Sequence, residues 1–497
     1  MTHRPDQLLS TSADERLLQE LGYRQELARR MSGFSNFAIS LSIICILAGG
    51  ITSFHVGLCS AGGASIGLGW PLVCLFSTVV AMTMGQIASA FPTAGGLYHW
   101  GSILGGRAYG WITAWFNLAG IVSALAAINA GTYDFATAAF GIAPPAEWTA
   151  TVKTIVVLLM TLSQGLLNHY GIHLTTRLTD LSGYLILIVA SVLTLALLAC
   201  ATHLEWARLW TFANFSGLPE SGAVFPRQEN LVWLFALGFL LPAYTITGFD
   251  ASAHISEETV GAAHNVPKGI IRSVWVSGLF GWVMICAILL AMPDVREGVN
   301  KAAEVVPWTL KSVLPAWLAR TLLGGIVAAQ YLCGLAALTS ASRMTYAFAR
   351  DGGLPWSQWL RAVNPRSKSP SVAVWASAIS AALFTILVPY TTIAAVCVIF
   401  LYISYVLPVA AGFFAHGRTW TRMGPWKLGR WYRPLAVVAT LGCLGLIVIG
   451  MQPPNQQAVW IVGAAVALLL IVWFGLERKR FKGPPRISTG GNGDNGG

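Results

Sequence analysis

The sequence predicts an all-α membrane protein with twelve transmembrane helices. Hydrophobic residues make up 55% of its 497 residues and charged residues 10%, and the mean hydropathy is +0.63. Such a chain has too few polar side chains for a soluble protein of this size. Apolar runs of about 17 to 25 residues, the length that crosses about 30 Å of hydrocarbon, recur along the whole chain.

The spans follow a polar N-terminal segment, residues 1–32. It lacks the basic start, apolar core and cleavage site of a secretory signal, so we expect the first span to be retained. Its Leu17, Leu21 and Met31 lie among charged residues, a spacing that suits either a helix along the membrane face or a solvated tail. The predicted spans are residues 34–58, 66–90, 110–136, 152–168, 180–201, 230–256, 272–292, 321–348, 371–389, 393–415, 435–451 and 458–475.

Basic residues gather in alternate loops of this plan. Residues 1–32, 343–368, 418–433 and 478–486 hold most of the 31 Lys and Arg. The positive-inside rule then predicts both termini, including the tail 476–497, in the cytoplasm of a multi-pass protein of the plasma (inner) membrane. The net charge of +11 therefore fits a lipid bilayer as partner and predicts no nucleic-acid partner.

Several classes of chemistry have no motif in the sequence. The eight cysteines form no Cys-x-x-Cys pair and have no histidine at metal-ligand spacing, so they are expected as small core residues. Neither a Gly-x-x-x-x-Gly-Lys-Ser/Thr sequence nor a soluble region large enough to hydrolyse a nucleotide is present. We therefore expect no metal, no cofactor, no enzymatic activity and no primary pump.

Small and polar residues interrupt two of the apolar spans near their middle, at 47–53 and at 243–250. Interruptions at matching places in two halves of a membrane protein usually mark a transporter's binding site. The backbone groups freed there must find partners inside protein or in a wet cavity. Gly49 and Gly50 suit close approach of a ligand to the main chain, although close helix packing is an alternative reading.

Five motifs resemble one transporter family. In chain order they are residues 21–40 (Leu-Gly-Tyr-Arg-Gln-Glu-Leu to Met-Ser-Gly-Phe-Ser-Asn-Phe-Ala-Ile-Ser), 88–98 (Ala-Ser-Ala-Phe-Pro-Thr-Ala-Gly-Gly-Leu-Tyr), 247–259 (Thr-Gly-Phe-Asp-Ala-Ser-Ala-His-Ile-Ser-Glu-Glu-Thr), 267–270 (Pro-Lys-Gly-Ile) and 342–355 (Ser-Arg-Met-Thr-Tyr-Ala-Phe-Ala-Arg-Asp-Gly-Gly-Leu-Pro). Their combination resembles the amino acid/choline (GABA permease) branch of the amino acid–polyamine–organocation superfamily. The resemblance implies a LeuT-like fold with inverted repeats at 33–201 and 229–415, broken helices 1 and 6, and peripheral helices 11 and 12 at 435–475.

The resemblance also implies where a substrate binds. A carboxylate would accept from N–H groups at the first break, and an ammonium group would donate to carbonyls at the second. Tyr244 takes the place of the aromatic that covers the substrate in relatives. The alternative is a tyrosine that only packs against other helices or lies in the interfacial belt. The expected substrate-binding residues are Gly49, Gly50, Ile51, Thr52, Tyr244, Ile246, Thr247 and Gly248.

The substrate class follows from the family only. An amino acid, with GABA prominent, ranks above choline or a polyamine, and import by alternating access ranks above exchange or substrate sensing without transport. A channel would show charged rings or a wide polar helix face, which the sequence lacks.

Asp250 follows the second break directly and is the sharpest candidate for coupling. It could exchange a proton, stay ionised beside a cation, or cap the helix that follows. Sodium-coupled relatives would instead use helix 8 hydroxyls, here Thr339, Ser340 and Ser342, while Ile186 stands where proton-coupled relatives can carry a lysine. We favour H+ through Asp250 over Na+. Asp134, Asp180, His55 and His254 are weaker candidates that packing or a hydrogen bond explains.

Two gates are expected. Glu257 and Glu258 could pair with Arg343 and Arg350 as an inner gate, or form a solvated charge cluster. The long connection 293–320 could form an outer lid, or a surface loop anchored by tryptophans. Helices 11 and 12 could support a homodimer.

Overall fold

The computed structural model describes residues 5–170, 172–220, 222–388 and 390–485. In that part the chain is built from helices joined by turns, with two isolated bridges, Met31 to Thr259 and His416 to Trp420. The glycine-rich end of the expected tail lies outside the described residues.

Ten helices of the described chain are long and apolar enough to cross a membrane. One of them is interrupted and consists of α2 (Gly33–Ile44) and α3 (Gly49–Thr52). The others are built on α5 (Trp70–Ala90), α7 (Arg107–Phe140), α8 (Thr149–His169), α9 (Ile172–Cys200), α13 (Ala262–Ala291), α16 (Ala316–Arg350), α19 (Tyr390–Ala415), α20 (Tyr432–Gly450) and α21 (Gln457–Val472). The two remaining predicted spans coincide with shorter apolar helices, Leu231–Thr245 and Ser371–Leu387.

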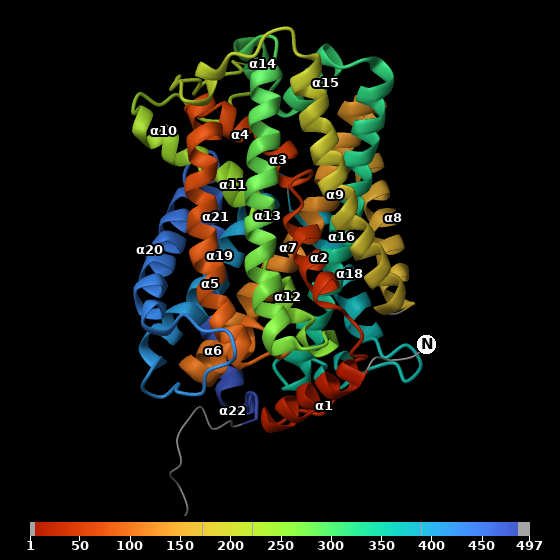
Figure 1. Cartoon of the computed structure of the whole chain (residues 1–497), viewed down its shortest axis with the longest axis vertical. Helices are drawn as coiled ribbons and strands as arrows, with labels where there is room; N and C mark the ends of the chain where they lie inside the picture. Colours follow the sequence, from red (N-terminus) through yellow and green to blue (C-terminus); the bar gives the residue numbers. More distant parts are fainter. Residues whose placement is uncertain (1–4, 171, 221, 389, 486–497) are drawn as a thin grey trace, which may run out of the picture.

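These helices form one upright bundle (Figure 1). α7 packs against α19 and α16, while α13 packs against α5 and α2. α21 and α20 expose large apolar side chains, as expected of helices in contact with lipid. α1 (Pro5–Glu20) and α22 (Arg478–Arg480) lie at one end of the bundle, here called the terminal side, and α14 (Val295–Asn300) and α15 (Val305–Val313) lie at the other (Figure 1).

Two interruptions meet in the middle of the bundle. After α2, Cys45 adopts φ +27°, which ends the helix, and the chain resumes as α3 and α4 (Phe54–Leu58). The shorter helix of α10 (Leu231–Gly238) and α11 (Leu240–Thr245) stops before Gly248 at φ +84°, a left-handed conformation that glycine adopts without strain. α12 (Ala251–His254) and η4 (Ser256–Glu258) follow. The interruptions therefore lie where small and polar residues break the apolar pattern.

The N-terminal segment packs against protein rather than along the membrane face. Leu18, Leu21 and Met31 are buried in hydrophobic clusters. The Asp14 carboxylate accepts from the N–H groups of Gly261 and Ala262, at 2.7 and 3.1 Å, at the start of α13. The apolar spacing that suits a membrane face suits a protein surface equally well, and here the protein surface covers it.

The connection 293–320 is partly helical. α14, η5 (Ala302–Glu304) and α15 precede α16, and Val305, Val306 and Leu314 are buried, whereas Trp317 is exposed. Through α15 the connection thus packs on the bundle.

Candidate substrate and coupling site

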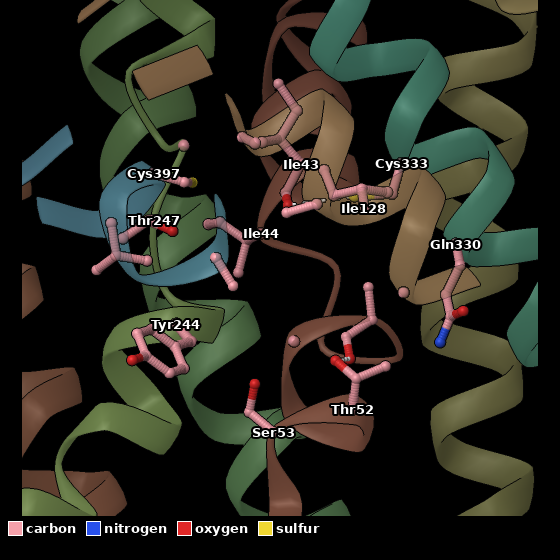
Figure 2. Close-up of a pocket in the computed structure, with 18 of the residues that line it drawn as sticks. Ile43, Ile44, Thr52, Ser53, Ile128, Tyr244, Thr247, Gln330, Cys333 and Cys397 are labelled. Carbon is pink, nitrogen blue, oxygen red and sulfur yellow. Dashed lines mark hydrogen bonds between the residues drawn. The ribbon is translucent and has the colours of Figure 1, made fainter. Parts of the chain in front are cut away.

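A cavity of about 100 Å³ lies between the two interruptions. In Figure 2, Tyr244 and Thr247 lie on one side of it and Gln330 and Cys333 on the other, with Thr52 and Ile44 between. Its lining residues are Ile43, Ile44, Ala48, Gly49, Thr52, Ser53, Ala124, Ala127, Ile128, Gly131, Thr132, Tyr244, Thr247, Gly248, Gln330, Cys333, Ala394, Cys397, Val398 and Leu401.

Five of the eight residues expected to bind substrate line this cavity, namely Gly49, Thr52, Tyr244, Thr247 and Gly248. Gly50, Ile51 and Ile246 are buried and do not line the cavity. Within the described chain, the N–H groups of Gly50 and Ile51 have no acceptor, and the carbonyls of Ile246 and Thr247 have no donor. Both interruptions thus leave main-chain groups without a protein partner in the described chain, and of these four residues Thr247 lines the cavity.

A second, larger cavity of about 960 Å³ leads to the first. The two share Thr52, Ser53, Gly131, Tyr244 and Ala394. The larger cavity also touches residues of η5, on the side away from the termini. The structure is therefore open on one side of the substrate cavity.

Tyr244 stands at the junction of the two cavities. Its hydroxyl accepts from Asn455 Nδ2 at 2.8 Å, in the connection between α20 and α21. Tyr244, which the family resemblance places over the substrate, thus lies in the passage between the substrate cavity and the open side.

Buried ion pairs close the terminal side. Arg343 binds both carboxylate oxygens of Glu258 at 3.0 Å, and neither side chain is exposed. Arg350 binds both oxygens of Glu257 at 3.0 Å. These four residues, expected as a gate or as a solvated cluster, therefore form two buried pairs that join η4 to α16.

The N-terminal segment is tied to the same layer. Arg29 donates to the carbonyls of Ser256 and Thr259, and the N–H groups of Arg30 and Met31 donate to the Glu258 carbonyl. Opening the terminal side requires these contacts to loosen.

A further carboxyl completes this layer. The hydroxyls of Tyr23 and Tyr98 both donate to Asp351 at 2.8 Å. Burial raises the pKa of Asp351, although the charge of the neighbouring Arg350 acts in the opposite direction.

Asp250 is enclosed by polar side chains from two other helices. Its Oδ1 accepts from the Tyr405 hydroxyl at 2.8 Å, and its Oδ2 accepts from Asn117 Nδ2 at 2.9 Å. Oδ2 also faces His254 Nε2 at 3.2 Å. Asp250 precedes α12 but makes no side-chain capping bond, so the capping alternative does not apply.

Two of the three hydroxyls considered for a cation, those of Thr339 and Ser342, are hydrogen-bonded within the bundle. Thr339 donates to Asn168 Oδ1 at 2.8 Å, and Ser342 accepts from Arg343, while the Ser340 hydroxyl is buried without a partner in the described chain. The first interruption instead contacts an earlier part of α16. Gln330 Nε2 donates to the Leu47 carbonyl at 3.0 Å and Cys333 to the Ile43 carbonyl at 3.4 Å.

The weaker candidates are distributed over the bundle. Asp134 pairs with Lys153 at 2.6 Å, and Asp180 accepts from Ser35 at 3.1 Å. His55 lines the larger cavity. His254 differs from these, because it contacts Asp250 inside the protein.

Sequence reasoning gave no site role to Asn117, Tyr405, Gln330 or Cys333, and it ranked His254 low. A signal exists, because each is a polar or thiol side chain in a predicted span, where such residues are costly. Many spans carry such residues, so only the packing identifies those that meet at the interruptions.

A multi-pass helical bundle with a cavity at two interrupted helices, open on one side and closed by ion pairs on the other, has the form of a membrane transporter. Comparison with known proteins agrees. The amino acid permease family matches residues 31–476, and the chain belongs to this family. This confirms the resemblance to the amino acid–polyamine–organocation superfamily.

Named relatives match over nearly the whole chain. The chain is 32% identical to "Amino-acid permease BAT1" of Arabidopsis thaliana, covering 94% of this chain and 95% of that protein. It is also 32% identical to a BAT1 homolog of Oryza sativa, covering 94% of each. The "GABA-specific permease" of Saccharomyces cerevisiae is 26% identical, covering 94% of this chain and 85% of that protein.

Proposed function

We propose that this permease imports an amino acid, with GABA prominent among its substrates, by alternating access. The observation that supports the proposal best is the cavity between two interruptions whose main-chain N–H and C=O groups lack protein partners in the described chain. A zwitterion supplies what both sets require, a carboxylate for the N–H groups and an ammonium group for the carbonyls. The name of the yeast relative, a GABA-specific permease, favours GABA within this class.

The proposed architecture has twelve spans, with inverted repeats at 33–201 and 229–415 and peripheral helices at 435–475. Interruptions in the first helix of each half support it. With both termini in the cytoplasm of the plasma membrane, the larger cavity opens to the outside. The pairs Glu257–Arg350 and Glu258–Arg343 then act as the inner gate.

Coupling to H+ through Asp250 completes the proposal. Asp250 is 1% exposed, directly follows the second interruption, and contacts three polar side chains. A carboxyl group in such a position can bind and release a proton during the cycle. Coupling to Na+ at Thr339, Ser340 and Ser342 is the alternative, and the experiment must distinguish it from coupling to H+.

Uptake into proteoliposomes tests this function. Labelled GABA, several other amino acids, choline and putrescine are offered under an imposed H+ or Na+ gradient, to the wild type and to Asp250→Asn. We expect an amino acid to accumulate under the H+ gradient and Asp250→Asn to lose accumulation while it retains binding. Binding of a panel member without accumulation under either gradient would indicate an exchanger or a sensor, and accumulation of choline or putrescine alone would contradict the amino acid assignment.

A further inference from the structure

His254 lies between two hydrogen-bond acceptors in the interior of the protein. It has no exposed surface. Its Nδ1 faces the Ala94 carbonyl at 3.3 Å, and its Nε2 faces Asp250 Oδ2 at 3.2 Å. A carbonyl oxygen only accepts, so Nδ1 carries a hydrogen. The contact between Nε2 and the carboxyl oxygen is favourable only when one more proton lies between them.

The pair therefore holds one proton beyond that on Nδ1, as an imidazolium beside a carboxylate or as an imidazole beside a carboxylic acid. We propose that this proton, shared by Asp250 and His254, is the one exchanged in transport, and that it connects the substrate cavity to the inner gate. The proposal rests on the proposed function and assigns the coupling site to a pair of residues.

One hydrogen-bonded path leads from the pair to the substrate cavity. The Tyr405 hydroxyl donates to Asp250 Oδ1 at 2.8 Å and accepts from the N–H of Gly248 at 2.8 Å. Gly248 and its neighbour Thr247 line the cavity. A change in the charge or position of Asp250 thus reaches the main chain that contacts the substrate through one hydroxyl.

A second path leads to the ion pairs. The Ala94 carbonyl faces His254, and the Ala94 N–H donates to Glu257 Oε1 at 3.0 Å. Glu257 in turn pairs with Arg350. The following turn is packed tightly against the ring, because a Cβ atom on Gly96 would lie 3.2 Å from His254 Cε1. Movement of the His254 ring therefore transmits to the Glu257–Arg350 pair.

The groups around Asp250 and His254 do not compensate the change in charge when this pair loses its proton. Asn117 from α7 is a neutral amide, and the Tyr405 hydroxyl from α19 donates to Asp250. The ring centroid of Tyr402 lies 5.9 Å from that of Tyr405. Among the charged groups on the terminal side, Glu257 pairs with Arg350 and Glu258 with Arg343, and Asp351 accepts from the Tyr23 and Tyr98 hydroxyls. A neighbouring histidine, His99 on α6 (Leu97–Gly105), bonds to Tyr23 and Thr93 instead.

Release of the proton requires the terminal side to open to water, because His254 and Asp250 are both buried in this structure. The N–H or O–H bond between His254 and Asp250 breaks, and the proton passes to water on the terminal side. A carboxylate oxygen then faces the lone pair of a neutral imidazole nitrogen, and the two repel each other. Separation of the two side chains pulls on Tyr405 and on Ala94 together, so release of the proton is tied to both the substrate cavity and the gate.

The test uses the full-length protein in proteoliposomes and reads two quantities. Counterflow of a labelled amino acid without any gradient reports substrate transport, and accumulation under an imposed H+ gradient reports coupling. We expect His254→Gln to retain counterflow within about threefold, to lose at least about tenfold in accumulation, and to lose the pH dependence of counterflow, because an amide cannot carry the exchanged proton. Asp250→Asn should behave in the same way.

His99→Gln is the matched control, since His99 is a buried histidine that faces no carboxylate, and it should retain coupling. Thermal unfolding in detergent identifies any variant that fails to fold, and His254→Asn then replaces His254→Gln. Undiminished accumulation in folded His254→Gln would overturn the proposal. Wild-type counterflow that responds to neither pH nor an H+ gradient would overturn it and leave amino acid transport standing, whereas no counterflow for any amino acid would contradict the proposed function as well.

Discussion

Two adjacent glycines in the first interruption have different surroundings. A Cβ atom on Gly49 would lie 2.6 Å from the Cα of Thr245, in the second interrupted helix. A Cβ atom on Gly50 would meet its nearest neighbour, Trp70, at 3.6 Å, which is an ordinary contact. Of these two glycines, only Gly49 is therefore required for the two interruptions to approach each other.

Gly49→Ala should lower the initial rate of uptake at least about tenfold, because the added methyl group pushes the two interruptions apart, a type of overpacking that costs about 1–3 kcal/mol. Gly50→Ala should stay within about twofold of the wild type. Both rates are divided by the amount of protein at the cell surface. Equal losses in the two variants would contradict this reading of the site.

Tyr244 contributes a ring and a hydroxyl, and the two can be tested apart. Tyr244→Ala should raise the KM for the transported amino acid at least about tenfold, because it removes the ring between the two cavities. Tyr244→Phe and Asn455→Ala should each change the KM by about fivefold or less, the effect of one neutral hydrogen bond of about 1 kcal/mol. A Tyr244→Phe variant as impaired as Tyr244→Ala would assign the main effect to the hydroxyl.

The residues of the site could be predicted where the main chain is unusual, and not where side chains meet across helices. Gly49 and Gly248 lie in sequences that break an apolar run, and the structure has its interruptions there. Gln330 and Tyr405 are single polar residues in long apolar spans. Their roles depend on which turn of one helix faces which turn of another, and a single sequence does not contain that register.

Among the elements, the spans follow from hydropathy because the bilayer requires a minimum apolar length. Hydropathy does not place the N-terminal segment in the same way, because its apolar face suits lipid and protein alike. In the structure the segment packs on protein, and Asp14 caps the start of α13. Glu257 and Glu258 were predicted to pair with Arg343 and Arg350, but the burial of these pairs depends on how η4 and α16 pack.

The Glu258–Arg343 pair joins η4 to α16 without any exposure to solvent. Arg343→Met should lower the stability by about 3–5 kcal/mol, because it leaves an uncompensated carboxylate in the interior. The double variant Glu258→Gln/Arg343→Met should recover much of this loss. Thermal unfolding in detergent measures both, and a double variant no more stable than the single one would show that the pair does not act as a unit.

On the scale of the whole molecule, basic residues and cavities are distributed unequally between the two sides. Basic clusters at 343–368, 418–433 and 478–485 lie towards the terminal side, which is closed by ion pairs, whereas the larger cavity opens on the side of α15. If the basic side faces the cytoplasm, as the positive-inside rule requires, the open cavity faces the exterior.

Labelling with a membrane-impermeant thiol reagent tests this orientation and the open state together. Exposed Cys200 is first replaced by Ser, and one cysteine is introduced at Ala303, in the larger cavity, or at Gln358, on the terminal side. In intact cells Ala303→Cys should react and Gln358→Cys should not, and permeabilised cells should label both, because only the bilayer protects the second position. The reverse pattern would place the termini outside and make the larger cavity an exit to the cytoplasm.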